Sequence, residues 1–376
     1  MNNFKKKLYN KINISIKNDF GIENYDEYRF GKYPVDSKKT DTKVSLSFKN
    51  IVKKIIGYHP ERKVFFNSVD ELIDKHLINI DKIWTVISKK DKLLFVSLIA
   101  YNILGYKKVK LPLNTTIYWE AIKKAKSLAN PDDTYDPNFM HFILQKFDLN
   151  PIGYNIKLYF SQIGIAIDYI IEQYAYKVEN TNIVHVEKGD VVLDIGGCWG
   201  DTALYFAHQT GEKGKVYSFE FIPQNIKIFK INTELNPHLI NQIELIDQPV
   251  SSKSGDTIYF KDFGPGSKVA FEPFEEQTGT CKTVSIDDFV KSKNIENIDF
   301  IKMDIEGSET LALEGALETI KKFRPKLAIA IYHSMEDFVN IPAWILNLDL
   351  DYEIYIGHYT IHSEETVCFA KPKSKN

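Results

Sequence analysis

Cysteine is scarce in this sequence, and its spacing excludes two classes of protein. The 376 residues contain three cysteines, Cys198, Cys281 and Cys368, and no CxxC pair. An odd number of cysteines without paired spacing argues against a disulfide framework and against a zinc finger. We therefore expect a protein of a reducing compartment, the cytoplasm.

Long apolar runs are missing as well. The longest, residues 93–106, contains Ser97 and Asn102 and is shorter than the ~20 residues that a membrane-spanning helix needs. The basic N-terminal segment lacks the apolar stretch of a secretory signal peptide. We expect no transmembrane segment and no signal peptide. Residues 93–106 are predicted to form a buried helix, with an interfacial helix between flanking lysines as the alternative.

The net charge is small, −2, but it is unevenly distributed. Residues 1–150 hold 27 Lys and Arg against 17 Asp and Glu, whereas residues 151–376 hold 21 against 33. The basic first part can attract an anionic partner such as a diphosphate, an acidic glycan or a lipid surface. The alternative is a solvated lysine-rich surface. No nucleic-acid-binding motif is present, so we expect no nucleic acid as a partner.

Apolar spacing divides the chain into two parts. Residues 66–147 show helical spacing, with a helix start near Asn67, further helices over 119–128 and 139–147, and a break at 130–133. We predict a mostly helical N-terminal domain with an irregular leader, residues 1–150. A second domain then occupies residues 151–376.

From Gly189 onward, short β-branched strands alternate with amphipathic helices. The predicted strands occupy residues 191–195, 215–219, 242–246, 300–303 and 327–331. The predicted helices occupy residues 201–209, 224–235, 308–323 and 335–348. Two last strands, residues 352–356 and 366–370, should form an antiparallel pair. The fold class is therefore α/β, a Rossmann-like parallel sheet with helices on both faces and a terminal antiparallel pair.

A glycine-rich turn is the strongest local signal. In VVLDIGGCWGD, residues 191–201, a strand runs through glycines into a helix. Glycine lets the backbone approach a ligand, and the helix start presents free N–H groups that hold a pyrophosphate in dinucleotide enzymes. The carboxylate of Asp194 would repel a pyrophosphate but suits an ammonium group, and the spacing is not GxGxxG. Both features favour S-adenosylmethionine over a nicotinamide dinucleotide. The predicted cofactor residues here are Asp194, Gly196, Gly197, Gly200 and Asp201.

Two further positions follow the next strands. Glu220 ends the second strand, where an acidic residue can accept hydrogen bonds from both ribose hydroxyls. Asp247 and Gln248 follow the third strand, and two interpretations remain open. They either face the adenine or merely finish the strand.

At these residues the sequence resembles the FkbM-type methyltransferases. The resemblance covers residues 165–371 and rests on DIGGCWGDTALYF, YSFEF, SIDDFV, FIKMDIEGSE and KLAIAIYHS. It implies a class I methyltransferase fold, S-adenosylmethionine as methyl donor, and a hydroxyl of a sugar or polyketide-like product as acceptor. It also implies which residues line the cofactor pocket, namely Asp194, Gly196, Gly200 and Glu220.

The resemblance further implies that Gln173 and Tyr174 touch the methionine end of the cofactor. The sequence departs from the family at Gly197 and Cys198, where members often carry Ala-Asn. The N-terminal helical part lies outside the resemblance, so it carries no inference about the substrate.

Acids and histidines stand where the predicted strands end. In an open α/β sheet, ligands bind at the carboxyl ends of the strands. Asp304 and Glu306 follow one strand, and His333 and His358 follow two others. Methyl transfer to a hydroxyl requires an aligned attack and the loss of the hydroxyl proton. These side chains are therefore the candidate catalytic group.

Two mechanisms remain open at this group. In one, His333 or Asp304 acts as the general base. In the other, a divalent cation, Mn²⁺ or Mg²⁺, lowers the pKa of the hydroxyl. Its predicted ligands are Asp304, Glu306, His333 and His358. For Glu306, and for Glu309 near the same helix start, a cap on the following helix is the alternative.

The sequence as a whole predicts an S-adenosylmethionine-dependent O-methyltransferase. The expected acceptor is a sugar hydroxyl, on a nucleotide-activated sugar or on a surface glycan precursor such as that of a capsule polysaccharide. The basic first part suits an acceptor that carries a diphosphate. Two rivals remain, a nicotinamide-dependent oxidoreductase and a non-catalytic cofactor-binding scaffold in glycan assembly. The sequence carries no prediction of the oligomeric state.

Overall fold

A computed structural model describes residues 3–34 and 59–373 of the chain. The chain divides into two compact units, residues 1–114 with 360–363 and residues 115–359 with 364–376. Residues 115–150 are thus grouped with the second unit, whereas the sequence assigned them to the N-terminal domain. The predicted boundary between two folding domains at residue 150 stays a prediction.

The first unit is helical in its described part. Its helices are α1 (Asn3–Ser15), η1 (Ile22–Asn24), α2 (Glu27–Phe30), α4 (His59–Asp74), α5 (Leu77–Val86) and α6 (Lys89–Leu104). The expectation of an irregular leader is wrong for residues 3–15, because Phe4, Leu8 and Ile12 recur at helical spacing and are buried. The ring of Phe4 packs edge-on against Trp84 at 5.3 Å. The leader segment 35–58 lies outside the described residues.

Helices α4 and α6 bear on two predictions. The helix start predicted at Asn67 is wrong, because α4 begins at His59 and runs through that position. The buried helix predicted for residues 93–106 is confirmed by α6, which the Ser88 side chain caps at its N-terminus. In the described ranges, we find no helix with both the length and the apolar character of a membrane span.

A three-stranded antiparallel sheet lies near the start of the second unit. The elements here are α7 (Thr116–Lys126), β1 (Ala129–Tyr135), β2 (Leu144–Asp148) and β3 (Lys157–Phe160). The helix predicted for residues 139–147 is wrong, because its second half is β2. Leu144 and Phe147 are buried at a spacing that also suits a helix, but the backbone of this segment pairs with β1 and β3 instead. Strand pairing thus overrides the local pattern.

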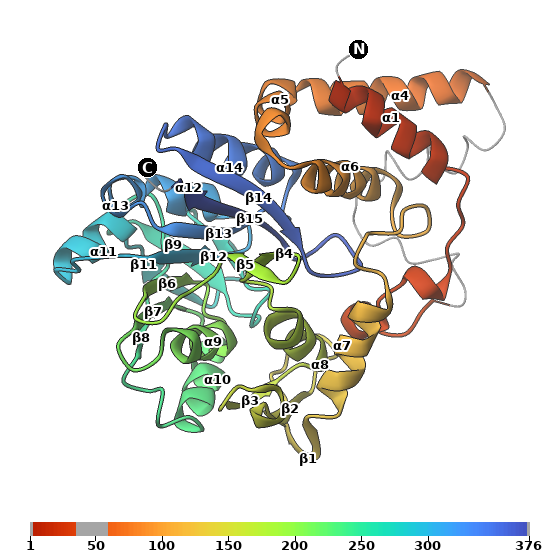
Figure 1. Cartoon of the computed structure of the whole chain (residues 1–376). Coiled ribbons are helices and arrows are strands. Elements are labelled where there is room, and N and C mark those ends of the chain that lie inside the picture. The colour runs from red at the N-terminus through yellow and green to blue at the C-terminus, as the bar shows by residue number, and fades with distance from the viewer. Residues whose placement is uncertain (1–2, 35–58, 374–376) are drawn as a thin grey trace. The chain divides into compact units, whose positions relative to one another are not determined.

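Seven strands form the central sheet of the second unit, in the order β14-β15-β13-β12-β6-β7-β8 (Figure 1). Their bounds are β6 (Val191–Ile195), β7 (Lys215–Phe219), β8 (Ile243–Ile246), β12 (Phe300–Met303), β13 (Lys326–Ala330), β14 (Tyr352–His358) and β15 (Thr366–Pro372). Strands β6, β7, β8, β12 and β13 pair in parallel, and β15 runs antiparallel between β13 and β14. The predicted parallel sheet with a terminal antiparallel pair is confirmed.

Helices form two groups beside this sheet. On one side, α9 (Asp201–Thr210) contacts α10 (Pro223–Glu234). On the other side, α11 (Ile286–Ser292) contacts α13 (Leu317–Phe323). On that same side, α12 (Glu309–Glu314) contacts α14 (Met335–Asn347). The helix predicted over residues 308–323 is two helices, α12 and α13, which meet at Gly315. A Cβ on Gly315 would lie 2.2 Å from the carbonyl oxygen of Ser251, so this turn packs against another backbone segment.

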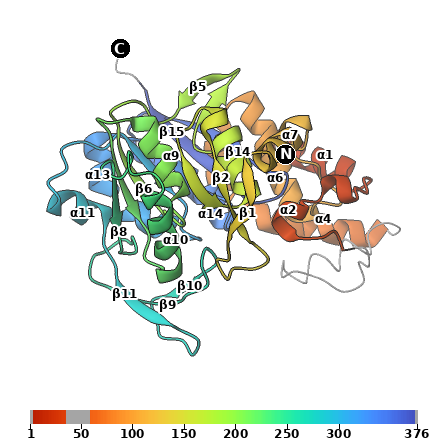
Figure 2. The same cartoon turned by 90° about the horizontal axis from the view of Figure 1, so that it is seen from below.

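The other described elements of the second unit are short. They are η2 (Asn150–Ile152), α8 (Gln162–Gly164), the π-helix η3 (Ile165–Ile171), β4 (Tyr176–Val178), β5 (Thr181–Val184), β9 (Thr257–Lys261), β10 (Lys268–Ala270) and β11 (Gly279–Lys282). Figure 2 shows the small antiparallel sheet of β9, β10 and β11 at the edge of this unit. The π-helix leads directly into the segment that carries Gln173 and Tyr174, which places it beside the site described next.

Candidate functional site

The glycine-rich turn packs directly against the end of β12. Gly196 follows β6 with φ of +90°, and a Cβ there would lie 1.9 Å from the carbonyl oxygen of Asp304. Only glycine allows both that backbone conformation and that approach. Gly200 has φ of +84° and immediately precedes α9. The turn therefore brings the start of α9 and the end of β12 to one edge of the sheet.

Asp194 is the last acidic residue before this turn, and its charge is neutralised inside the protein. Its carboxylate accepts hydrogen bonds from Ser218 Oγ at 2.7 Å and from Thr202 Oγ1 at 3.0 Å. The Nζ of Lys302 lies 3.2 Å from Asp194 Oδ1 and donates to the Gly196 carbonyl at 2.6 Å. Burial opposes a charge on Lys302, but Asp194 and its neighbouring acids raise the pKa of this lysine. Asp194 as a ligand of an ammonium group stays a prediction.

Glu220 lies just beyond β7 and is connected to the turn. Its two oxygens accept from the backbone N–H of Ile222 at 2.8 Å and from the side-chain amide of Asn225 at 3.1 Å. Asn225 in turn accepts from the indole N–H of Trp199. Burial raises the pKa of Glu220 to about 7, although these hydrogen bonds oppose the rise. Each carboxylate oxygen keeps a lone pair, so Glu220 can still accept hydrogen bonds from a ribose.

Asp201 is the first residue of α9 and is buried. Burial raises the pKa of Asp201 to about 6, and the charge of Lys302 opposes the rise. By contrast, Asp247 is exposed and Gln248 is half-buried beyond β8. Contact of either residue with an adenine stays a prediction.

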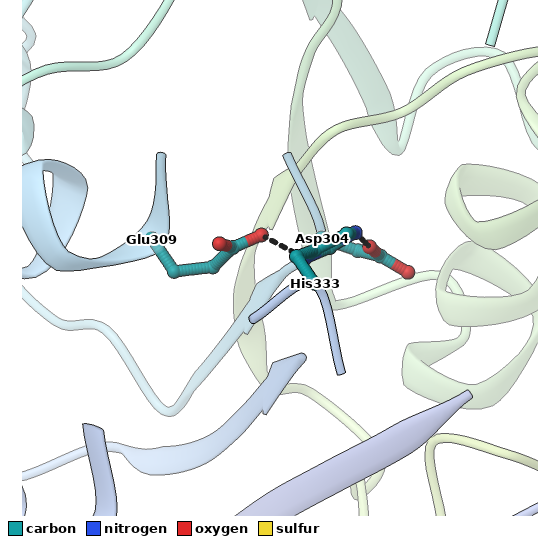
Figure 3. Close-up of side chains that lie close together, drawn as sticks. All are labelled: Asp304, Glu309 and His333. Atoms are coloured by element: carbon teal, nitrogen blue, oxygen red, sulfur yellow. Dashed lines mark ion pairs between the residues drawn. The ribbon is translucent and has the colours of Figure 1, made fainter. Parts of the chain in front are cut away.

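Three side chains converge beyond the ends of β12 and β13 (Figure 3). His333 Nε2 lies 3.5 Å from Asp304 Oδ1, and His333 Nδ1 lies 3.3 Å from Glu309 Oε1. Glu309 is fully buried and also accepts from the backbone N–H of Ile305 at 2.8 Å. The three residues offer ligand atoms that all lie within 4.8 Å of one another. We call this group the Asp304 cluster.

The acids of the cluster control the charge of its histidine. Burial alone would lower the pKa of His333, but the carboxylates of Glu309, Asp304 and Glu306 raise it to about 10. At neutral pH the isolated imidazole is therefore protonated, and it then has no lone pair with which to accept a proton. A cation bound by the carboxylates would compete with that proton. The donor set of two carboxylates and one imidazole fits Mn²⁺ or Mg²⁺.

Two tyrosines hold Asp304 on its other side. The hydroxyl of Tyr332 donates to Asp304 Oδ1 at 3.1 Å, and that of Tyr174 donates to Oδ2 at 3.2 Å. Burial and the charge of Asp304 hold the pKa of both tyrosines well above their usual value, so both remain donors. Gln173 donates to Glu365 Oε2 at 2.6 Å. Gln173 and Tyr174 thus belong to the same edge as the cluster, and their contact with a cofactor stays a prediction.

The two other predicted metal ligands lie differently. The side chain of Glu306 is 60% exposed, and its Oε2 lies 3.7 Å from His333 Nε2. His358 is hydrogen-bonded to Thr366 on the neighbouring strand β15 at 2.8 Å. Neither residue belongs to the group whose ligand atoms lie within 4.8 Å of one another, which is Asp304, Glu309 and His333. Their roles at a metal stay predictions.

Sequence reasoning did not assign three residues that the structure brings to this edge. Lys302 neutralises Asp194, Tyr332 holds Asp304, and Glu309 completes the Asp304 cluster in place of Glu306. A signal for Lys302 was present, because a lysine inside the otherwise apolar strand FIKM must be paired where it is buried.

Comparisons with known proteins bear on the family that this chain resembles. Residues 185–354 match the family model described as the methyltransferase FkbM domain, so the resemblance predicted from the sequence is confirmed over these residues. A curated relative, the hexuronic acid methyltransferase AglP of Haloferax volcanii, is 27% identical over 135 residues. That match covers 36% of this chain and 53% of the relative, so the chain spans about half the length of the curated relative it matches.

Two solved structures are similar at lower identity. The methyltransferase FkbM of Methylobacillus flagellatus KT is 17% identical, with a TM-score of 0.47 over 79% of this chain and 59% of that one. The fibrillarin of Aeropyrum pernix, solved with bound S-adenosyl-L-methionine, is 14% identical, with a TM-score of 0.33 over 50% of this chain and 70% of that one.

Proposed function

We propose that this protein is an S-adenosylmethionine-dependent O-methyltransferase that acts on a sugar hydroxyl. The observation that carries the proposal is the match of residues 185–354 to the methyltransferase FkbM domain. The match includes the glycine-rich turn, Glu220 and the whole Asp304 cluster. The residues to which we assign ribose binding and proton removal therefore lie within the matched segment.

The cofactor assignment is supported by the residues at the turn. The free N–H groups at the start of α9 and the carboxylate of Glu220 suit the methionyl and ribose parts of S-adenosylmethionine. The buried Asp201 Oδ1 has no hydrogen-bond partner in the described part of the chain. An unpartnered buried acceptor suits a ligand that brings hydrogen-bond donors. A pyrophosphate, which brings acceptors only, would not suit it.

The chemistry assigned to the site is an in-line displacement. When bound, the cofactor supplies an electrophilic methyl group. The acceptor oxygen forms the new C–O bond while the C–S bond breaks, and that electron pair stays on sulfur. The hydroxyl proton must leave to a base, which we assign to the Asp304 cluster. Because His333 is protonated on its own, we propose that Asp304, Glu309 and His333 hold Mn²⁺ or Mg²⁺, which would lower the pKa of the acceptor hydroxyl.

The acceptor class is supported by one relative and by charge. The printed name of the curated relative concerns a hexuronic acid. The basic residues 1–150 suit an acceptor that carries a diphosphate or acidic groups. We therefore propose a nucleotide-activated sugar or a surface polysaccharide precursor, such as one of a capsule. The three cysteines are free, which accords with a cytoplasmic site for the reaction.

Calorimetry on the full chain tests the cofactor first. S-adenosylhomocysteine should bind, and NADH at the same concentration should not. Nucleotide sugars are then screened for methylation with labelled cofactor and Mn²⁺. Binding of NADH alone would select the oxidoreductase. Binding of S-adenosylhomocysteine without any methylated product from charged or neutral sugars would select the scaffold.

A further inference from the structure

A buried pair of carboxyl groups lies beside the glycine-rich turn, and the function proposed above gives no role to one of them, Asp168. Asp168 comes from the π-helix η3 and Asp201 from the first turn of α9. The side chain of Asp168 is near enough to affect the pKa of Asp201, and both residues are more than nine-tenths buried. We call them the carboxyl pair. Asp201 Oδ1 has no hydrogen-bond partner among the described residues.

Two buried carboxyl groups side by side destabilise the folded protein unless a ligand neutralises them or donates hydrogen bonds to them. Burial and the charge of Asp201 raise the pKa of Asp168 well above its usual value. A second negative charge beside Asp201 is therefore unfavourable unless a cation neutralises it. The buried cation that also acts on both acids is Lys302, but its Nζ already contacts Asp194 and Gly196. A buried acceptor without a partner destabilises the folded protein, because it has lost its hydrogen bonds to water. The π-helix that presents Asp168 is itself a rare structure that is often found at functional sites.

The position of the pair is defined by its neighbours. Asp201 directly follows the glycine-rich turn. The segment that follows η3 carries Tyr174, whose hydroxyl donates to Asp304 Oδ2 at 3.2 Å. The carboxyl pair thus lies beside the turn and on an element that leads to the cluster. In a methyltransferase the sulfur must reach the acceptor at the cluster, so the amino-acid end attached to that sulfur is expected near the carboxyl pair.

We propose that Asp168 and Asp201 bind the ammonium group of the methionyl end of the cofactor. This inference rests on the proposed function. An ammonium group brings three donors and one positive charge, which matches two carboxyl groups with an open acceptor. Asp194, to which the sequence argument gave this role, is already neutralised by Lys302, Ser218 and Thr202. Asp194 is accordingly a residue that positions the turn, and the carboxyl pair recognises the ligand.

The test compares two ligands that differ only at the amino group. Binding of S-adenosylhomocysteine and of its desamino analogue, which keeps the carboxylate, is measured by calorimetry on the full chain. The wild-type protein should bind the desamino analogue about 10–100-fold more weakly, the range of a charge-assisted hydrogen bond. The substitutions Asp201→Asn and Asp168→Asn should weaken the binding of S-adenosylhomocysteine by a similar factor. They should leave the affinity for the desamino analogue unchanged.

Two comparisons keep the result unambiguous. Unchanged binding of the analogue by each variant shows that the variant is folded. Asp91→Asn, which removes an equally buried carboxylate from α6 in the first unit, should leave both affinities unchanged. If the variants weaken both ligands equally, or neither ligand, the inference is wrong and the proposed function stands. If the wild-type protein binds neither ligand, the proposed function itself fails.

Discussion

Lys302 and Asp194 form a buried ion pair between adjacent strands. The two residues are Cα partners in the parallel pairing of β12 with β6. Their side chains are 2% and 0% exposed, and Lys302 Nζ lies 3.2 Å from Asp194 Oδ1. The pair thereby joins the strand that leads into the glycine-rich turn to the strand that leads into the Asp304 cluster. A lysine in the centre of the sheet has a structural role here.

Breaking this pair should destabilise the protein strongly. Lys302→Met keeps the volume of the side chain but leaves Asp194 charged and buried, which should lower the free energy of unfolding by about 3–5 kcal/mol. Urea denaturation measures the change. The double variant with Asp194→Asn should be markedly more stable than the sum of the two single effects predicts. Strictly additive effects would show that the two charges do not interact.

The elements around the turn could be predicted because their signals are local. A run of β-branched residues, the glycines and an amphipathic segment follow one another at residues 191–209. The pairing of Lys302 with Asp194 could not be predicted, because it depends on the register between strands that are distant in sequence. The same applies to β2, whose apolar spacing suits a helix until its pairing partners are known.

In the Asp304 cluster, too, the sequence allowed some residues to be predicted and not others. Asp304 and His333 were predictable because each closely follows a strand. The sequence did not allow a prediction of which glutamate, Glu306 or Glu309, would lie beside His333. Glu306 has φ of +55° and Gly307 φ of +92°, so the chain reverses there and leaves Glu306 exposed. One turn later, the buried Glu309 returns to the backbone N–H of Ile305 and to His333.

Gly196 and Gly189 form a matched pair for testing the packing of the turn. Both have positive φ, +90° and +89°, so alanine at either position incurs a backbone cost of about 1 kcal/mol. Only Gly196 faces another backbone, with Asp304 O 1.9 Å from an added Cβ, whereas a Cβ on Gly189 has nothing within 4 Å. Gly196→Ala should therefore lose stability well beyond Gly189→Ala and lose S-adenosylhomocysteine binding. Similar melting temperatures for the two variants would contradict this packing.

Glu220 should make stability depend on pH. Its pKa in the folded protein is raised by burial to about 7, above the value of an unfolded glutamate. Its contribution is therefore fully present below pH ~4.5 and is lost as the pH rises to about 7, by roughly 3 kcal/mol. Glu220→Gln should remove this loss. Urea denaturation from pH 4.5 to 7.5 should then show the variant gaining stability relative to wild type.

A control separates Glu220 from the other groups that titrate in this range. Glu212 is exposed, and Glu212→Gln makes the same chemical change on the surface. The pH profile of that variant should run parallel to that of the wild type. A parallel profile for Glu220→Gln as well would mean that burial does not raise the pKa of Glu220.

Mn²⁺ titration should distinguish the histidines of the predicted metal site. His333 shares its position with Asp304 and Glu309, whereas His358 is hydrogen-bonded to Thr366. In chelator-treated protein, with free Mn²⁺ counted by electron paramagnetic resonance, His333→Gln should weaken binding at least about tenfold. His358→Gln should bind as the wild type does. Affinity should also rise with pH, because the imidazolium of His333 must lose its proton to a bound cation. Equal affinities for wild type and His333→Gln would remove the metal from the proposal and leave Asp304 as the base.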